Sequence, residues 1–221
     1  MLLAVSGCAP APSESPAASG DGPEQASITV GVLPIVDVAP IYLAIDRGLF
    51  AGEGLDVSIE RVQGGAAAIP ALVSGDLDFS YGNWVSFLLA NQRGIELRAV
   101  AAGVSATPGL TEFLALPTSG LEGKPVNMAG ATVALNTLNN IGELALRSLL
   151  EANGLGVDAV QLLEVAFPAM GATLERGDVD VIWASEPVPT IVKGDLDAVV
   201  VADSFSGDMA GFPVAGYQAT A

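Results

Sequence analysis

The 221-residue chain contains no histidine and only one cysteine. A lone cysteine cannot close an internal disulfide, and without histidine the chain lacks the usual general base and the commonest metal ligand. These absences exclude zinc sites and catalytic triads of the Ser/His or Cys/His type. We therefore predict no catalytic residue, no metal and no cofactor, and hence a protein that is not an enzyme.

Basic and aromatic residues are also scarce. Eight Lys and Arg stand against 25 Asp and Glu, and the formal charge of −17 would repel a nucleic-acid backbone and an anionic membrane face. Aromatic residues make up 5% of the chain and hydrophobic residues 51%, so we expect a core of Ala, Val, Leu and Ile. No apolar run approaches the roughly 18 residues that a spanning helix needs. We expect no nucleic-acid partner.

An internal repeat is the most informative feature that is present. Residues 131–193 repeat the order expected for residues 28–93: strand, polar loop, helix, strand, short loop, Ala-containing helix, and a Gly-Asp-x-Asp turn into a third strand. This order predicts an α/β fold of two lobes, each a three-layer α/β sandwich. Such sheets bind ligands just outside the carboxyl ends of their strands, so a cleft between the lobes is the expected binding site.

The repeat also predicts the domain organisation. Lobe one covers residues 27–110, lobe two covers residues 111–211, and residues 212–221 return towards lobe one. We expect residues 111–117 and 212–217 to be the segments that cross between the lobes, because both are apolar and show little helix signal.

Residues 1–26 predict a lipoprotein signal remnant followed by a flexible tether. The sequence LAVSGC at residues 3–8 resembles a bacterial lipobox, in which small residues allow cleavage before a cysteine that then carries the lipid. The alternative is a chance cysteine in a disordered leader. The residues after Cys8 are rich in Ala, Pro, Ser and Gly, a composition that cannot bury a core. We expect an extracytoplasmic protein that meets the membrane through this lipid alone.

Five phrases in residues 27–217 together resemble a known family. They are APIYLAIDRGLF (39–50), EGLDV (53–57), ALVSGDLDF (71–79), NTLNNIGELALR (136–147) and WASEP (183–187). In this order they resemble the substrate-binding proteins of ABC importers in the nitrate/sulfonate/taurine and thiamine-pyrimidine-precursor group. The resemblance implies a two-lobed, type II periplasmic-binding-protein-like fold, ABC permease subunits as partners, and a monomer that closes over a small molecule.

The chain differs from the resembled family in two ways. Family members normally continue past the second crossing segment with helices that complete lobe one, so the C-terminal part is expected to be missing here and lobe one to lack part of its cover. One branch of the superfamily makes the thiamine pyrimidine with a histidine and a cysteine-rich motif. Without those residues, a pyrimidine-precursor synthase is the weaker alternative, and a sensor domain would need a further module.

The loop at residues 136–140 is the first candidate site. It joins the end of a strand to the start of a helix at Ile141, so free backbone N–H groups there favour an anion or a carbonyl. We predict ligand contact by at least one of Thr137, Asn139 and Asn140. The alternative is helix capping, since Asn140 and Glu143 have the spacing of a capping box.

Lobe one offers an acid in the equivalent loop. Asp37 either caps the helix that begins near Ala39 or binds ligand, and Glu186, before Pro187 in lobe two, has the same ambiguity. Two acids facing one cleft would select a ligand with hydrogen-bond donors or positive charge. Gly65 completes the candidates from this side of lobe one.

Polar and aromatic side chains also follow the third strand of each lobe. Tyr81, Asn83 and Trp84 do so in lobe one, with Trp183 and Phe167 near the matching positions of lobe two, where a flat ring could be sandwiched. Sulfonates, nitrate, aromatic acids, pyrimidines and riboflavin-like rings all remain open as ligands. By contrast, the Asp pairs at 76/78 and 178/180 are expected to shape turns away from the cleft and not to bind metal.

Overall fold

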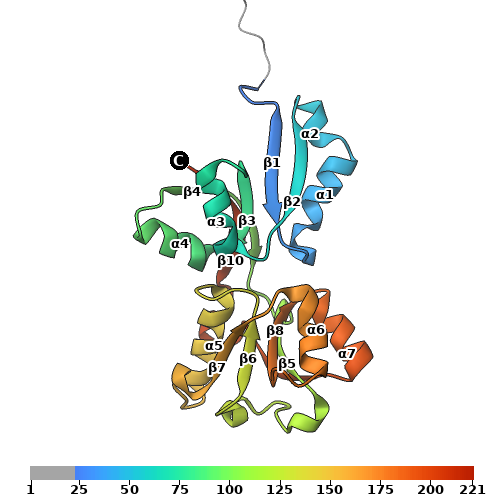
Figure 1. Ribbon diagram of the computed structural model, residues 1–221, viewed down its shortest axis with the longest axis vertical. Coiled ribbons are helices and arrows are strands. Elements are labelled where there is room, and N and C mark those ends of the chain that lie inside the picture. The colour runs from blue at the N-terminus through green and yellow to red at the C-terminus, as the bar shows by residue number, and fades with distance from the viewer. Residues whose placement is uncertain (1–22) are drawn as a thin grey trace, which may run out of the picture.

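The computed structural model describes residues 23–221, and Cys8 with its lipobox lies outside this range. Two five-stranded sheets, one above the other, build an elongated molecule (Figure 1). We call the sheet β2-β1-β3-β10-β4 with its helices lobe one, and the sheet β7-β6-β8-β5-β9 with its helices lobe two. The expected α/β fold of two lobes is confirmed, since the chain forms two separate sheets.

The elements of lobe one alternate between strand and helix. Its strands are β1 (Ser27–Val32), β2 (Asp56–Arg61), β3 (Phe79–Asn83), β4 (Leu97–Ser105) and β10 (Pro213–Thr220), and its helices are α1 (Ala39–Asp46), α2 (Leu49–Gly52), α3 (Gly65–Ser74) and α4 (Trp84–Gln92). A short 3-10 turn, Val36–Val38, precedes α1. α1 and α2 lie on one face of the sheet and α3 and α4 on the other (Figure 1).

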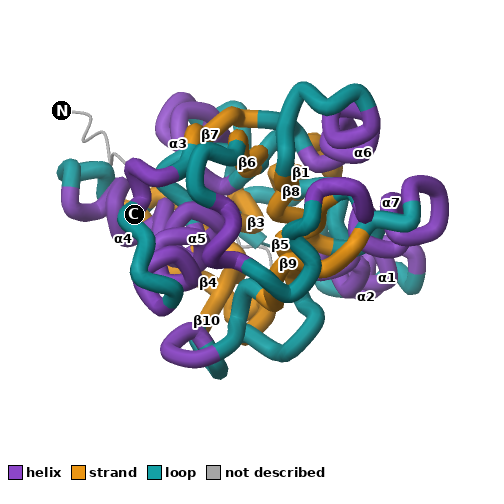
Figure 2. Tube along the Cα trace, turned by 90° about the horizontal axis from the view of Figure 1, so that it is seen from below, coloured by secondary structure: helices purple, strands orange, loops and turns teal. Residues whose placement is uncertain are grey.

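Lobe two repeats this plan. Its strands are β5 (Thr111–Ala115), β6 (Thr132–Leu135), β7 (Gln161–Glu164), β8 (Val181–Ser185) and β9 (Val199–Asp203), and its helices are α5 (Ile141–Ala152), α6 (Phe167–Glu175) and α7 (Val188–Leu196). Four 3-10 turns join them: Pro117–Ser119, Pro125–Met128, Val157–Ala159 and Gly207–Met209. Seen along the long axis, α4 and α5 lie on one side of the strands and α1, α2, α6 and α7 on the other (Figure 2).

Each sheet is completed by one antiparallel strand. β1 is parallel to β2 and β3, and β6 is parallel to β7 and β8, whereas β10 and β5 run antiparallel to both of their neighbours. Residues 111–115 and 213–217, which we expected to cross between the lobes, form β5 and most of β10 in the structure. The chain passes from one sheet to the other at residues 106–110, and again at residues 210–212 after the 3-10 turn Gly207–Met209. The bounds that we assign to the two lobes along the chain remain a prediction.

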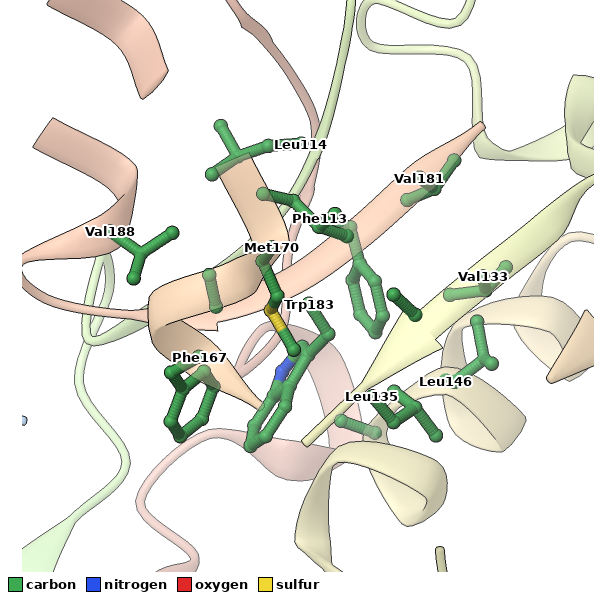
Figure 3. Packing of buried hydrophobic residues seen from close by; sticks show 14 of the residues in the cluster. Phe113, Leu114, Val133, Leu135, Leu146, Phe167, Met170, Val181, Trp183 and Val188 are labelled. Carbon is green, nitrogen blue, oxygen red and sulfur yellow. The ribbon is translucent and has the colours of Figure 1, made fainter. Parts of the chain in front are cut away.

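The main hydrophobic cluster runs through both lobes, and most of it lies in lobe two, where aliphatic strands pack against α5, α6 and α7. Phe113 and Leu114 are neighbours on β5, point to opposite faces of the sheet and are both fully buried. Around them pack Val133, Leu135, Leu146, Met170, Val181 and Val188 (Figure 3). This packing explains why β5, β6 and β8 read as short apolar runs, since strands covered on both faces have no polar side.

The two Gly-Asp-x-Asp turns make the same hydrogen bond in both lobes, between an aspartate carboxylate and the backbone of a neighbouring strand. The Asp78 carboxylate accepts a hydrogen bond from the Thr29 backbone N–H (2.7 Å), and the Asp180 carboxylate accepts one from the Thr132 N–H (2.8 Å). Each aspartate thereby ties the start of the third strand to the start of the first, at the sheet edge away from the other lobe. The prediction that these residues shape turns is confirmed. Within residues 23–221, no cluster of three or more acids, His or Cys is arranged to hold a metal.

The face of the lobe-one sheet that carries α1 and α2 is only partly covered. Beside α1 and α2 lies an apolar hollow of about 540 Å³, which we call the lobe-one hollow, lined by Val30, Phe79, Val100 and Tyr217 among others. Most of β4 is exposed, and Val100 keeps 54% of its surface accessible. In lobe two, Met128, Phe205 and Met209 are buried in the core. No helix within residues 23–221 is long and apolar enough to cross a membrane.

Candidate functional site

A small cavity of about 40 Å³ lies between the lobes, where the carboxyl ends of β1, β3, β6 and β8 face one another. Six of the ten predicted binding residues line it: Asp37, Gly65, Tyr81, Asn83, Asn140 and Ile141. Asn136, from the candidate loop at residues 136–140, also lines it, and so do Thr111 and Ser185 of lobe two, which sequence reasoning missed. The structure therefore brings most of the candidates together at the expected edge of the sheets, and ligand contact by each of them stays a prediction.

Four buried polar atoms around this cavity have no hydrogen-bond partner in residues 23–221. They are Asp37 Oδ1 and Tyr81 Oη from lobe one, and Thr111 Oγ1 and Ser185 Oγ from lobe two. Tyr81, Thr111 and Ser185 are each at least 97% buried. Buried polar groups are normally paired, because leaving one unpaired costs about 1–3 kcal/mol. Unpaired groups that converge from both lobes are what a site for a polar ligand requires.

The ionisation of these groups follows from their burial. Burial raises the pKa of Asp37 above its ordinary value, while its own backbone N–H and the Ser185 and Tyr81 hydroxyls partly oppose that rise. Neither hydroxyl has a hydrogen-bonding geometry with the carboxylate. Burial, and then the nearby Asp37 charge, raises the pKa of Tyr81, so its phenol stays protonated and able to donate.

The charge around the cavity has one sign. All eight Lys and Arg fall within residues 23–221, and none of them lines the cavity, whereas Asp37 does. Three basic side chains are held in ion pairs elsewhere, Arg147 with Glu143 (2.7 Å), Arg176 with Asp178 (2.8 Å) and Lys193 with Glu112. A bound ligand would therefore meet an acid and no basic side chain.

The side-chain oxygens of the two asparagines in the site, Asn83 and Asn140, cap helices. The Asn83 side chain accepts from the Ser86 N–H (2.9 Å) at the start of α4, and the Asn140 side chain accepts from the Glu143 N–H (3.0 Å) at the start of α5. The expected capping by Asn140 is confirmed, but the reciprocal bond of a capping box is not formed, because the Glu143 carboxylate accepts from the N–H of Asn139 and not from that of Asn140. Both asparagines therefore act structurally and line the cavity at once.

Aromatic rings form one wall of the site on lobe two. The Phe167 and Trp183 ring centroids lie 5.9 Å apart with planes inclined by 41° (Figure 3). Trp183 donates its indole N–H to the Ser204 hydroxyl (2.9 Å), which fixes the ring from behind. Both rings line the cavity, as the sequence suggested for this pair.

Four predicted binding residues lie outside the cavity wall, and each has a structural task. Trp84 packs edge-on against Phe87 and covers Gly216, where a side chain would overlap its ring. The Glu186 carboxylate accepts from the Thr190 backbone N–H and hydroxyl in the first turn of α7. An aromatic or acidic residue next to a strand end can either pack within a lobe or face the cleft. Its spacing in the sequence does not distinguish these two roles.

The other two belong to the loop before α5. Asn139 is exposed and holds a left-handed backbone conformation, with φ of 54°. Thr137 is buried against Gly64 of lobe one and accepts a hydrogen bond from the Asn140 amide (3.2 Å). The loop therefore contacts the opposite lobe through these residues and reaches the cavity through Asn136 and Asn140.

Four hydrogen bonds join the lobes around the cavity, and we call them the interlobe latch. The Gln63 amide donates to the Asn136 carbonyl (3.0 Å), and the Asn136 amide donates back to the Gln63 carbonyl (3.1 Å). The Ser86 hydroxyl donates to the Asn139 carbonyl (2.9 Å), and the Val36 N–H donates to the Glu186 carbonyl (3.0 Å). The enclosed 40 Å³ holds little more than one water molecule, so an organic ligand requires the lobes to separate.

Comparison with known proteins gives relatives for almost the whole chain. It is 28% identical over 142 residues to a formylaminopyrimidine-binding protein from Halalkalibacterium halodurans, covering 64% of this chain and 42% of the relative. It is 26% identical over 224 residues to the riboflavin-binding protein RibY of Chloroflexus aurantiacus, covering 93% of this chain and 62% of the relative. The chain thus spans less than two thirds of the length of either protein.

Solved structures share the fold. The alkanesulfonate-binding protein SsuA from Xanthomonas axonopodis pv. citri superposes with a TM-score of 0.78 at 20% identity, covering 90% of this chain and 67% of that one. The nitrate-binding protein NrtA from Synechocystis PCC 6803 gives a TM-score of 0.74 at 14% identity, covering 90% and 57%. These neighbours confirm the type II periplasmic-binding-protein fold. The family model described as NMT1/THI5 like matches residues 35–202, and the chain therefore belongs to that family.

Proposed function

We propose that this chain is the ligand-binding part of an extracytoplasmic solute-binding protein, which captures a small organic molecule between its lobes and delivers it to an ABC importer. The convergence of four unpaired buried polar atoms from both lobes is the observation that carries the proposal. Every relative named above is a binding protein, which favours a binding role over an enzymatic one.

The proposed mechanism is hinged closure. With the lobes apart, the Tyr81 and Asp37 side chains of lobe one and the Ser185 and Thr111 hydroxyls of lobe two face solvent across the cleft. A ligand that pairs with both sets stabilises the closed form, because its contacts from each lobe exist together only when the lobes meet. The latch adds direct contacts between lobes in that form. An importer would then recognise the closed surface, which forms only at the rim of a shut cleft.

Removal of single hydroxyls tests this use of the site. Once native mass spectrometry has identified the ligand that copurifies with the full chain, Tyr81→Phe and Ser185→Ala should each weaken its binding about ten- to a hundredfold, the cost of one buried hydrogen bond. Tyr42→Phe and Ser206→Ala are matched controls, since both residues are exposed and neither lines the cavity. Equal calorimetric affinities for the site variants and the controls would refute the proposal.

We further propose that Cys8 carries a lipid that holds the protein at the outer face of the cytoplasmic membrane. Cys8→Ala in the full-length gene should move the protein from the membrane fraction to the soluble or secreted fraction. Ligand affinity should not change, since the tether precedes the folded lobes. Unaltered fractionation would contradict the assignment of the lipobox.

The ligand itself is left open by the relatives. Their names include formylaminopyrimidine and riboflavin on one hand, and alkanesulfonate and nitrate on the other. The first two are rings that carry N–H groups, and the last two are oxyanions.

A further inference from the structure

The choice between an N–H-bearing ring and an oxyanion depends on the charges that line the cavity, and it rests on the proposed binding function. Asp37 is the one charged residue that lines the cavity within residues 23–221. Its Oδ1 atom is buried and has no hydrogen-bond partner. The Tyr81 and Ser185 hydroxyls act on this carboxylate, yet neither forms a hydrogen bond of normal geometry with it, so the acceptor is offered to a ligand. In its ionised form a carboxylate only accepts hydrogen bonds, and the ligand atom that pairs with it would then be a donor.

An oxyanion would find little compensation in this site. None of the eight Lys and Arg lines the cavity, and the Asp37 charge would repel the ligand at close range and low dielectric. The helices α4 and α5 do begin at the cavity, but the side chains of Asn83 and Asn140 already accept from their first turns. The partial positive charge of a helix start, about half an elementary charge, is smaller than the full charge of Asp37.

The remaining groups suit a flat ring with mixed polar edges. The unpaired hydroxyls of Tyr81, Thr111 and Ser185 can each donate or accept. The Phe167 and Trp183 rings supply an apolar wall beside them. A ring with both N–H groups and acceptor atoms would therefore satisfy the hydroxyls and the carboxylate together, and no hydroxyl would be left unpaired.

We propose that Asp37 is the specificity-determining residue of the cavity, that it accepts a hydrogen bond from an amino or ring N–H group of a neutral or cationic heterocycle, and that it rejects free sulfonates and nitrate. The hydroxyls of Tyr81 and Ser185, which line the same cavity, pair with other atoms on the edge of the same ring.

A pair of probes of matched size tests the donor requirement on the full chain. Calorimetry would compare 4-amino-2-methylpyrimidine with 2,4-dimethylpyrimidine, in which a methyl group replaces the amino group and no N–H remains, and add riboflavin, taurine, benzenesulfonate and nitrate. We expect the amino compound or riboflavin to bind, the dimethyl compound to bind at least tenfold more weakly than the amino compound, and the three oxyanions to give no measurable heat. Binding of an oxyanion, equal binding of the two pyrimidines, or failure of both donor-bearing probes would overturn the proposal.

Substitution of Asp37 tests whether this residue is the source of the preference for ligands with N–H donors. Asp37→Asn should weaken the donor-bearing probe about ten- to a hundredfold and reduce discrimination against benzenesulfonate, whereas Asp46→Asn, on the exposed side of α1, should change neither. If Asp37→Asn does not fold, the comparison of probes on the unaltered chain decides alone. An oxyanion whose binding is lost in Tyr81→Phe would leave the proposed function standing and refute this inference. A chain that binds no solute of any class and copurifies with none would refute both.

Discussion

The interlobe latch should hold the ligand-free protein shut, and its removal should open the molecule by a calculable amount. Gln63→Ala deletes the amide that donates to the Asn136 carbonyl, and Ser86→Ala deletes the hydroxyl that donates to the Asn139 carbonyl. Each hydrogen bond contributes about 0.5–1.5 kcal/mol. Together the two substitutions should cost the closed form about 1–3 kcal/mol, or roughly a five- to 150-fold shift in the ratio of closed to open molecules.

A distance between the lobes reports this shift directly. Cys8 is the one cysteine in the sequence, so Cys8→Ser clears the chain for spin labels attached through Glu53→Cys and Glu122→Cys, both exposed and one in each lobe. Pulsed electron spin resonance should show one short distance for the parent protein and a growing long component for the latch variants.

The control must lose an amide that makes no contact between lobes. Gln92→Ala fits, since Gln92 is exposed at the end of α4 and takes no part in the latch. A long component of equal size in the control and the double latch variant would refute the reasoning. So would an unchanged distance distribution in the double variant, because the latch would then contribute nothing to closure.

Three further predictions concern stability. Asp180→Ala should lower the free energy of unfolding by about 1–3 kcal/mol without changing ligand affinity, as measured by urea denaturation and calorimetry, since its carboxylate holds only the start of β6. Burial raises the pKa of Asp37, so the folded protein holds the carboxyl proton more tightly than the unfolded chain does. The free energy of unfolding therefore falls as pH rises from about 3.9, the unfolded pKa, through the folded pKa. The difference in free energy of unfolding between Asp37→Asn and the parent should therefore shift in favour of the variant as pH rises from 3.5 to 8. A difference that stays constant across that range would contradict the argument. Val100→Lys places a charge on the exposed strand beside the lobe-one hollow and should slow aggregation in light scattering, whereas an unchanged rate would show that another surface drives association.

The sequence predicts the fold of this chain well because the decisive signals are local. Apolar runs at residues 28–33 and 131–135 mark the first strand of each copy of the repeat, and Asp78 and Asp180 lie in matching turns that the structure uses in the same way. The crossing segments were misplaced because an apolar run such as residues 111–115 has the same pattern whether it links two sheets or pairs within one.

The site is less predictable because it depends on contacts between distant residues. Ser185 was not among the predicted binding residues, and only its pairing with Thr111 of β5 places both hydroxyls at the cleft. Trp84 was favoured because it follows a strand, yet it packs on Gly216 of the last strand. Local propensity identifies which strand ends carry polar groups, whereas the partner strand decides which of these groups face the cavity.

The position of β10 has a consequence for how the chain acquires its structure. The five strands of lobe two follow one another along residues 111–203, so that lobe can complete its sheet from one continuous stretch. Lobe one begins earlier at the ribosome, but its sheet stays incomplete until β10 is made, because β10 lies between β3 and β4 and follows all the strands of lobe two in the chain. Pairing across such a separation is slow, and the unfilled edges of β3 and β4 are exposed to other chains in the meantime. We therefore expect lobe two to complete its sheet before lobe one, although lobe one begins first in the chain.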